Sequence, residues 1–169
     1  MDEQSLPNRD ERMNMAPVRG VVPATQAVGH DQEDTQLIRA MADDAARYSD
    51  GFTWCESVLE VYFAAGVGGV LCVFLLHIRP SRDGVDEWMW VVIGDIPPAY
   101  LPLEDCSSAK EVFETYLWGM RNWVRSAKLG RSGTDEDNIP PVNVAATPEN
   151  AALLEKRLAK LEELLMPFF

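Results

Sequence analysis

The fold is decided by two runs of sequence, Val70-Leu-Cys-Val-Phe-Leu-Leu-His-Ile78 and Glu87-Trp-Met-Trp-Val-Val-Ile93. Both runs are rich in branched and aromatic side chains, which favour β-strands. The residues that join them include Asp83-Gly84, a strong turn signal. The simplest arrangement is therefore an antiparallel hairpin.

Both faces of this hairpin are apolar, because alternate side chains of a strand point to opposite sides. One face carries Trp88, Trp90 and Val92, and the other carries Met89, Val91 and Ile93. Helices or a second subunit must cover both faces. The sequence thus predicts an α+β fold, with a small antiparallel sheet built on a hairpin at about 70–78 and 87–93 and packed by about four helices.

Helical spacing of apolar residues, together with capping residues, marks these four helices. They begin near Asp31 or Asp34, at Thr53, at Ser107 or Ser108, and at Thr147. The helix over residues 53–65 has a competing interpretation as a strand, because the segment is rich in valine and aromatic residues. Pro97 and Pro98 should end the second strand, since consecutive prolines cannot continue a ladder.

Residues 1–30 are predicted to form a disordered tail, because they contain three prolines, no aromatic residue and no sustained periodicity. Residues 31–169 should then form a single domain. Translation could start at Met1, Met13 or Met15.

Composition narrows the classes of partner. The formal net charge of −12 repels nucleic acid and anionic membranes and suits a basic protein. The longest uncharged apolar run, residues 61–76, is shorter than the roughly 20 residues of a spanning helix. The N-terminus lacks the apolar core of a secretory signal. Three widely spaced cysteines fit reduced thiols and a cytoplasmic location.

No motif for a metal or a cofactor is present. The chain has two histidines and no closely spaced cysteine pair, so we expect no zinc site. Gly66-Val-Gly-Gly69 fails the dinucleotide fingerprint because a predicted strand follows it, and the Walker lysine is absent. A turn explains these glycines better, and we expect no cofactor.

Asp95 is the best single candidate for catalysis, because it follows a strand end between a glycine and two prolines. Its alternative role is to cap a turn through backbone N–H groups. In the hairpin His77 lies opposite about Met89, roughly 20 Å of strand away from Asp95, which excludes a His–Asp dyad. Cys72 lies near Asp95, but a cysteine within an apolar strand is usually a buried hydrophobe.

Several side chains are candidates for binding a partner. Residues 107–132 hold five basic and two acidic residues in an otherwise acidic chain, and helical spacing places four side chains on one stripe: Trp118, Arg121, Arg125 and Lys128. The basic residues could instead only compensate the helix dipole. The other candidates are an acidic loop at Asp135, Glu136 and Asp137, and the terminal Phe168 and Phe169. The five tryptophans could line a pocket, although those on alternate strand positions usually fill a core.

The segment Trp90-Val-Val-Ile-Gly-Asp-Ile-Pro-Pro-Ala-Tyr100, followed by a long helix, resembles a pattern in small bacterial proteins that form a family of unknown function. Pro141-Val-Asn-Val-Ala-Ala-Thr-Pro-Glu149 is similar to a later part of that pattern. The resemblance covers roughly residues 70–169. It implies a bacterial cytoplasmic protein and no particular activity.

The favoured hypothesis is a non-enzymatic interaction domain, an adaptor, regulator or immunity-type inhibitor that binds a protein partner, which its acidity suggests is basic. The alternative is a small enzyme or ligand-binding domain with a pocket at the Gly94-Asp95-Ile96-Pro97 corner, where Asp95 acts as acid or base beside Cys72, Tyr100 or Arg121. A third possibility is a homodimer that buries one face of the sheet.

The acidic loop gives a first prediction. Replacing Asp135, Glu136 and Asp137 with lysine should weaken binding to a basic partner, and the loss should shrink as salt is added, because salt screens exposed charges. Titrations at low and high ionic strength measure both effects. Unchanged affinity together with an unchanged salt dependence would contradict a role for the loop.

Overall fold

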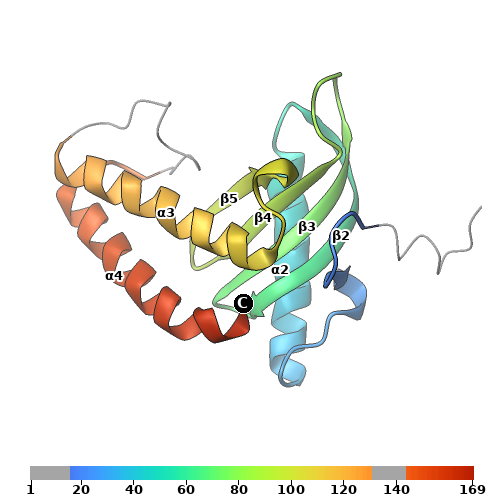
Figure 1. The fold of residues 1–169 in the computed structure, drawn as a ribbon, viewed down its shortest axis with the longest axis horizontal. Helices are drawn as coiled ribbons and strands as arrows, with labels where there is room; N and C mark the ends of the chain where they lie inside the picture. Colours follow the sequence, from blue (N-terminus) through green and yellow to red (C-terminus); the bar gives the residue numbers. More distant parts are fainter. Residues whose placement is uncertain (1–15, 131–143) are drawn as a thin grey trace, which may run out of the picture.

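The computed structural model describes residues 16–130 and 144–169, and within them five antiparallel strands are ordered β1-β2-β3-β4-β5. Consecutive strands are neighbours throughout, so the sheet is a simple meander (Figure 1). The strands are β1 (Val22–Pro23), β2 (Cys55–Val67), β3 (Leu71–Pro80), β4 (Trp88–Gly94) and β5 (Ile96–Pro102).

Three long helices complete the described part of the chain: α2 (Gln32–Asp50), α3 (Ala109–Lys128) and α4 (Pro148–Leu165). Three short 3₁₀ turns flank them: η1 (Ala24–Gln26), η2 (Leu103–Asp105) and η3 (Met166–Phe168). The α+β class and the antiparallel hairpin at the centre of the sheet are therefore confirmed. The described residues form three long helices instead of about four, and the segment predicted as a further helix is a strand.

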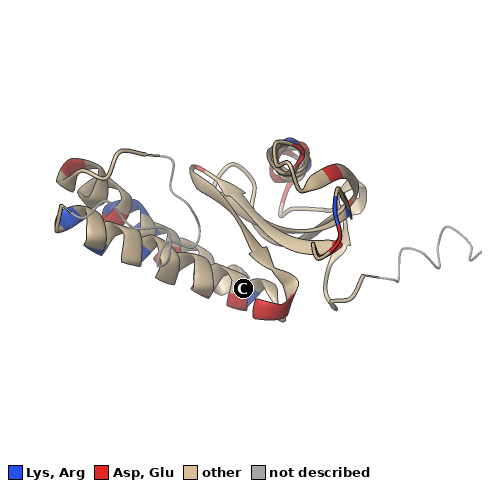
Figure 2. Ribbon diagram, turned by 90° about the horizontal axis from the view of Figure 1, so that it is seen from above, with Lys and Arg blue, Asp and Glu red and all other residues tan. Residues whose placement is uncertain are grey.

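Helices cover both faces of the sheet, as its apolar pattern requires. Helix α2 lies on one face, where Ile38 and Met41 pack with Phe74 and Val91. Helix α3 lies on the other face, with α4 beside it, so that the molecule has three layers (Figures 1 and 2). Helix α4 packs mainly against α3, and the two helices extend beyond the sheet (Figure 1).

The three long helices each begin at a side-chain cap that can be recognised in the sequence. The side chains of Asp31, Ser108 and Thr147 each accept a hydrogen bond from a backbone N–H three residues further on. Such caps satisfy donors that the first turn leaves without an intrahelical partner. These starts confirm the predicted ones.

The predicted helix over residues 53–65 is wrong, because Cys55–Val67 forms the longest strand, β2. Irregular pairing with β3 explains the error, since the register shifts between Cys55 and Ser57 and again between Val58 and Glu60. Each bulge inserts a residue, so that side chains facing α2 recur at helix-like intervals instead of every second position. Pairing with β3 outweighs the local capping signal.

Prolines do not stop the sheet where the sequence suggested. Pro97 and Pro98 lie within β5, which continues from Ile96 to Pro102. A proline is tolerated there because β5 is an edge strand, in which alternate backbone N–H groups have no neighbouring strand to pair with. A tight connection at Gly94 and Ile96, which pair directly, lets β4 reverse into β5.

The hairpin register differs by one residue from the predicted one. His77 pairs with Trp88, and Leu71 pairs with Gly94. The loop between Pro80 and Trp88 is too long to fix the register in the way that a two-residue turn does. The side-chain faces are as predicted, with Trp90 and Val92 toward α3.

The predicted tail falls partly outside the described residues, which begin at Ala16. Residues 1–15 are not described, and for them disorder stays a prediction. Beyond them the prediction is wrong, because Val22 and Pro23 pair with Phe63 and Tyr62 to form β1. Val18 and Val21 pack against the core on the α3 side.

A buried carboxylate fastens α2 to the turn between β2 and β3. Asp34 is 6% exposed, and its Oδ1 accepts the Gly68 N–H at 2.6 Å while its Oδ2 accepts the His30 N–H at 2.9 Å. A Cβ atom on Gly68 would lie 2.7 Å from the Asp34 carbonyl oxygen, so the approach requires glycine. Burial acts to raise the pKa of Asp34, but these backbone hydrogen bonds and the His30 imidazole outweigh it and the pKa is lowered.

This contact predicts a specific loss of stability. Asp34→Asn should lower the free energy of unfolding at neutral pH by about 1–3 kcal/mol. The asparagine side chain has a single carbonyl oxygen, so its NH₂ group replaces one of the two oxygens that accept these hydrogen bonds. A carboxyl whose pKa is lowered by folding stabilises the fold above its unfolded pKa of about 4, and this contribution disappears as the pH falls through the folded pKa. The deficit of the variant should therefore shrink in acid.

Urea unfolding at several pH values between neutral and acidic measures this deficit. The matched control is Asp43→Asn on the exposed side of the same helix, which should change the free energy of unfolding little. Equal midpoints for the two variants at neutral pH would rule out the proposed role of Asp34.

Candidate functional site

The Asp95 corner lies at one end of the sheet, where β4 reverses into β5. The Asp95 N–H donates to the Val70 carbonyl at 3.1 Å, which joins this corner to the turn between β2 and β3. A Cβ on Gly94 would lie 2.4 Å from the same Val70 oxygen, so glycine is needed here as well. The Asp95 side chain is exposed.

A cavity of about 200 Å³ separates this corner from α4. Its polar side chains are Asp95 on one wall and Arg157 and Lys160 on the other, and Arg157 donates to the Asp95 carbonyl at 3.4 Å. Apolar side chains complete the lining: Val70, Ile96, Leu161 and Leu164. Two cations above an apolar floor can hold an anionic group attached to an apolar body. The sequence analysis missed Arg157 and Lys160 because it considered only the apolar stripe of α4 and not the side chains beside that stripe.

The predicted companions of Asp95 lie elsewhere. Cys72 is fully buried toward α2, and burial, together with the charge of Asp34, raises its pKa to about 12. Tyr100 lies further along β5, paired with Val91. Arg121 forms an ion pair with Glu162. None of these side chains lines the cavity beside Asp95.

Neither histidine lines the cavity beside Asp95. His77 is at the far end of the hairpin, as the predicted separation required, and its ring stacks on Trp88 with centroids 4.3 Å apart. His30 Nδ1 lies 2.9 Å from Asp34 Oδ2, and its Nε2 lies 3.2 Å from Asp31. The His30–Asp34 contact was missed because residue 30 was assigned to the tail, although the i,i+4 spacing of these two residues gave a signal.

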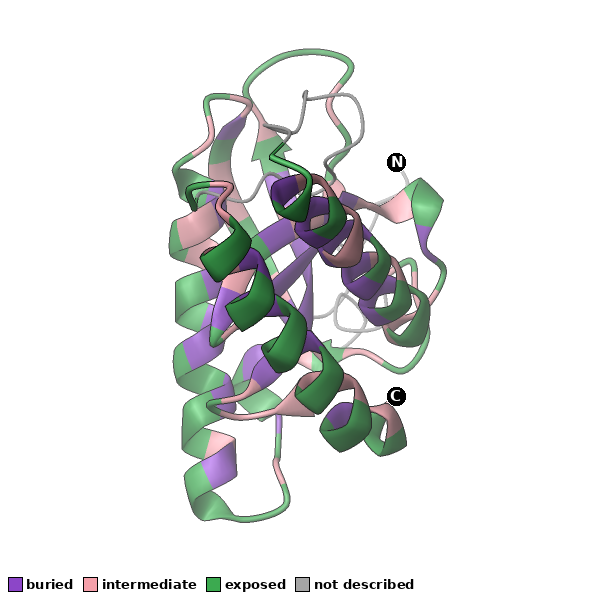
Figure 3. Cartoon of the chain, turned by 90° about the vertical axis from the view of Figure 1, so that its left-hand side faces the viewer, coloured by how far each residue is buried: buried purple, intermediate pink, exposed green. Residues whose placement is uncertain are grey.

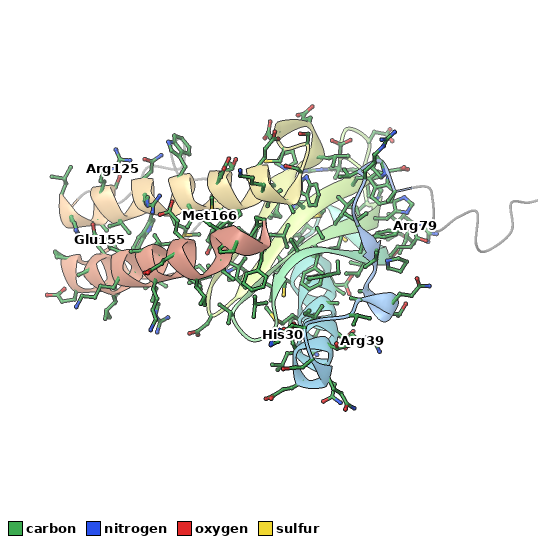
Figure 4. The ribbon with its side chains drawn as sticks, turned by 60° about the horizontal axis from the view of Figure 1, so that its bottom comes forward. His30, Arg39, Arg79, Arg125, Glu155 and Met166 are labelled. Carbon is green, nitrogen blue, oxygen red and sulfur yellow. The ribbon has the colours of Figure 1, made fainter. Side chains whose placement is uncertain are left out.

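The basic stripe on α3 is partly engaged within the fold. Arg121 pairs with Glu162, and Lys128 with Glu155, so that both cations link α3 to α4. Arg125 donates to the neighbouring Asn122 at 2.9 Å. Figure 4 shows Arg125 and Glu155 near the same end of these two antiparallel helices.

Trp118 is the apolar member of the stripe, and 59% of its surface is exposed. Figure 3 shows exposed residues along the outer sides of the helices and buried ones toward the sheet. At the C-terminus, Phe168 is 52% exposed, whereas Phe169 stacks on the buried Phe113 with centroids 4.6 Å apart. The loop with Asp135, Glu136 and Asp137 lies outside the described residues.

The tryptophans divide into two groups. Trp90 and Trp123 are buried in the core, where the Trp90 Nε1–H donates to the Cys106 carbonyl at 3.0 Å. Trp54 and Trp88 are half-buried, and with Trp118 they are accessible at the surface. Of the two tryptophans on alternate strand positions, Trp90 fills the core as predicted, whereas Trp88 is only partly buried against it.

The buried thiols give a prediction. Burial raises the pKa of all three cysteines, and for Cys72 a pKa of about 12 lowers the thiolate fraction at pH 8 by about 10³-fold. In the folded protein the thiols should therefore react with Ellman's reagent far more slowly than free cysteine does. In urea all three should react at once. A thiol that reacts rapidly in the folded protein would contradict their assignment as core residues.

Comparison with protein-family models, with curated proteins and with solved structures finds no match. The resemblance carried by residues 90–100 therefore stays a prediction. In residues 16–130 and 144–169, no helix combines the length and the apolar character that crossing a membrane requires. Function has to be inferred from the side chains themselves.

Proposed function

We propose that this chain is a non-enzymatic protein-interaction domain, an adaptor, regulator or immunity-type inhibitor, which binds a protein partner through the outer side of α3. The observation that carries the proposal is the exposure of Trp118, a residue type that concentrates binding energy when a partner buries it. Leu129 lies about three helical turns further along the same side and is 70% exposed.

Contacts within the fold preorganise the surface around Trp118. The ion pairs Arg121–Glu162 and Lys128–Glu155 fix α3 to α4, and the Phe113–Phe169 stack ties the chain end to the first turns of α3. A rigid helix face loses little conformational entropy on binding. The same ion pairs neutralise two of the three cations on this stripe, which reduces its repulsion of a basic protein.

A basic protein is the partner that suits the chain as a whole. A net charge of −12 attracts positively charged proteins over long range and increases their rate of association. A second copy of the chain carries the same charge and is a weaker candidate. We place the protein in the bacterial cytoplasm, which its three free cysteines support.

A second candidate function is supported by the cavity beside Asp95. Its volume of about 200 Å³ and its cations, Arg157 and Lys160, suit part of a small ligand that bears a carboxylate or phosphate. Asp95 would then contact the ligand as an acid or base. The two functions use different surfaces, so that substitutions separate them.

Trp118→Ala should weaken binding to the partner by at least about tenfold, or 1.4 kcal/mol, because the variant loses the apolar area buried by the indole. The partner is first captured from the source cells at low and at high salt and identified by mass spectrometry. Its affinity is then measured by calorimetry with purified proteins. Leu59→Ala, an exposed apolar position on β2, is the control and should bind normally.

The outcomes distinguish the two functions. If Trp118→Ala binds normally while Arg157→Ala does not, the cavity beside Asp95 is the site and the interaction surface on α3 is wrong. If light scattering shows a dimer that Trp118→Ala dissociates, the partner is a second copy and not a basic protein.

A further inference from the structure

The cavity beside Asp95 is lined by charges of both signs. Arg157 and Lys160 belong to α4, whereas Asp95 belongs to the corner where β4 reverses into β5. The lining positions 157, 160, 161 and 164 of α4 are spaced three or four residues apart, so one face of the helix carries two cations and two leucines. The cavity therefore combines a basic group, an acidic group and an apolar surface.

The three charged groups do not neutralise one another. Arg157 donates to the backbone carbonyl of Asp95, and neither it nor Lys160 forms an ion pair with a described residue. The Asp95 carboxylate likewise has no hydrogen-bond or ion-pair partner in the described part of the chain. Arg121 and Lys128 of α3 differ in this respect, because each pairs with a glutamate of α4. The charges of the cavity are thus available to a ligand.

Backbone contacts and buried side chains hold the walls of the cavity in a fixed relation. The Asp95 N–H donates to the Val70 carbonyl at 3.1 Å, and the Arg157 side chain donates to the Asp95 carbonyl at 3.4 Å. On α4, the buried Leu158 and Leu165 anchor the helix in the core. A ligand therefore meets a preformed site, which lowers the entropic cost of binding.

Charge selects a zwitterion over a simple anion. An anion would be attracted by the two cations, but the Asp95 carboxylate and the net charge of −12 of the whole chain would repel it. A ligand with one group of each sign has no net charge and complements both kinds of lining group. The volume of about 200 Å³ lies below the roughly 300–1,000 Å³ of sites for drug-sized ligands, so the ligand is small.

We propose that this cavity binds a free α-amino acid with an apolar side chain. The ligand carboxylate contacts Arg157 and Lys160, and its ammonium group contacts the Asp95 carboxylate. The side chain of the ligand packs on the apolar lining, which consists of Val70, Ile96, Leu161 and Leu164. The proposal rests on the second candidate function given above, whose ligand it specifies, and it is independent of the Trp118 surface.

The test titrates L-leucine into the full chain and follows methyl signals in ¹H–¹³C spectra. Saturable shifts are expected for Ile96 and Leu164, assigned by Ile96→Val and Leu164→Met, while the signals of Ile38 on the α2 side stay in place. Two further probes each lack one charged group: isocaproate has no amine, and isoamylamine has no carboxylate. Each should bind about five- to tenfold more weakly than leucine, a loss between that of an exposed ion pair and that of a charge-assisted hydrogen bond.

Variants match each charge of the protein to one group of the ligand. Asp95→Asn should weaken the binding of leucine and strengthen that of isocaproate, because it removes a carboxylate that attracts only the ammonium group. Arg157→Gln and Lys160→Gln should weaken the binding of both leucine and isocaproate. Lys156→Gln, at an exposed position of α4 outside the cavity lining, is the control and should change nothing. Trp118→Ala should also bind leucine normally, so the two surfaces are tested separately.

Three results would overturn the proposal, and they differ in what they leave standing. If neither leucine nor isocaproate produces saturable shifts, both the amino-acid ligand and the cavity function are wrong. If isocaproate binds as tightly as leucine and Asp95→Asn strengthens the binding of both, the cavity is a site for simple anions and only the amino-acid ligand is wrong. If N-acetylleucine, which lacks the ammonium charge, binds as tightly as leucine, the cavity holds the C-terminal residue of a peptide instead of a free amino acid.

Discussion

Burial of β3 on both of its faces is the constraint on which the rest of the structure depends. From Leu71 to Leu76 every residue has no exposed surface. Exposing such a strand on either side would place a continuous apolar surface in water, so each face requires its own helix. Helix α2 covers one face and α3 the other, and α4 therefore packs mainly against α3.

The edges of the sheet are protected by different means. Strand β5 carries Pro97 and Pro98. Strand β2 is bulged at two places between Cys55 and Glu60, and β1 pairs with it at Tyr62 and Phe63. Irregular or proline-bearing edges do not offer a regular ladder to another chain. Helices cover both faces of the sheet, and both edge strands are irregular. The surfaces that remain for binding a partner are therefore the ends of the sheet and the outer sides of the helices. The cavity beside Asp95 lies at one of these ends.

Charge alone is a poor guide to the candidate sites. The basic stripe on α3 is apparent in the sequence, yet Arg121 and Lys128 are engaged with glutamates of α4. The cations that line a cavity, Arg157 and Lys160, lie instead on α4. Whether a charged side chain is free depends on the helix beside it, and the sequence does not reveal that neighbour.

The sequence by itself determined the features that depend on local chemistry. It specified the central hairpin, the alternation of its faces, the capped starts of α2, α3 and α4, and hence the α+β class, because side-chain periodicity and capping act over a few residues. Only the tertiary structure decided that residues 55–67 form a bulged strand, that Pro97 and Pro98 lie within an edge strand, and that Asp34 reaches across to Gly68. These outcomes depend on a partner distant in sequence, whose pairing and burial energy outweigh the local preference.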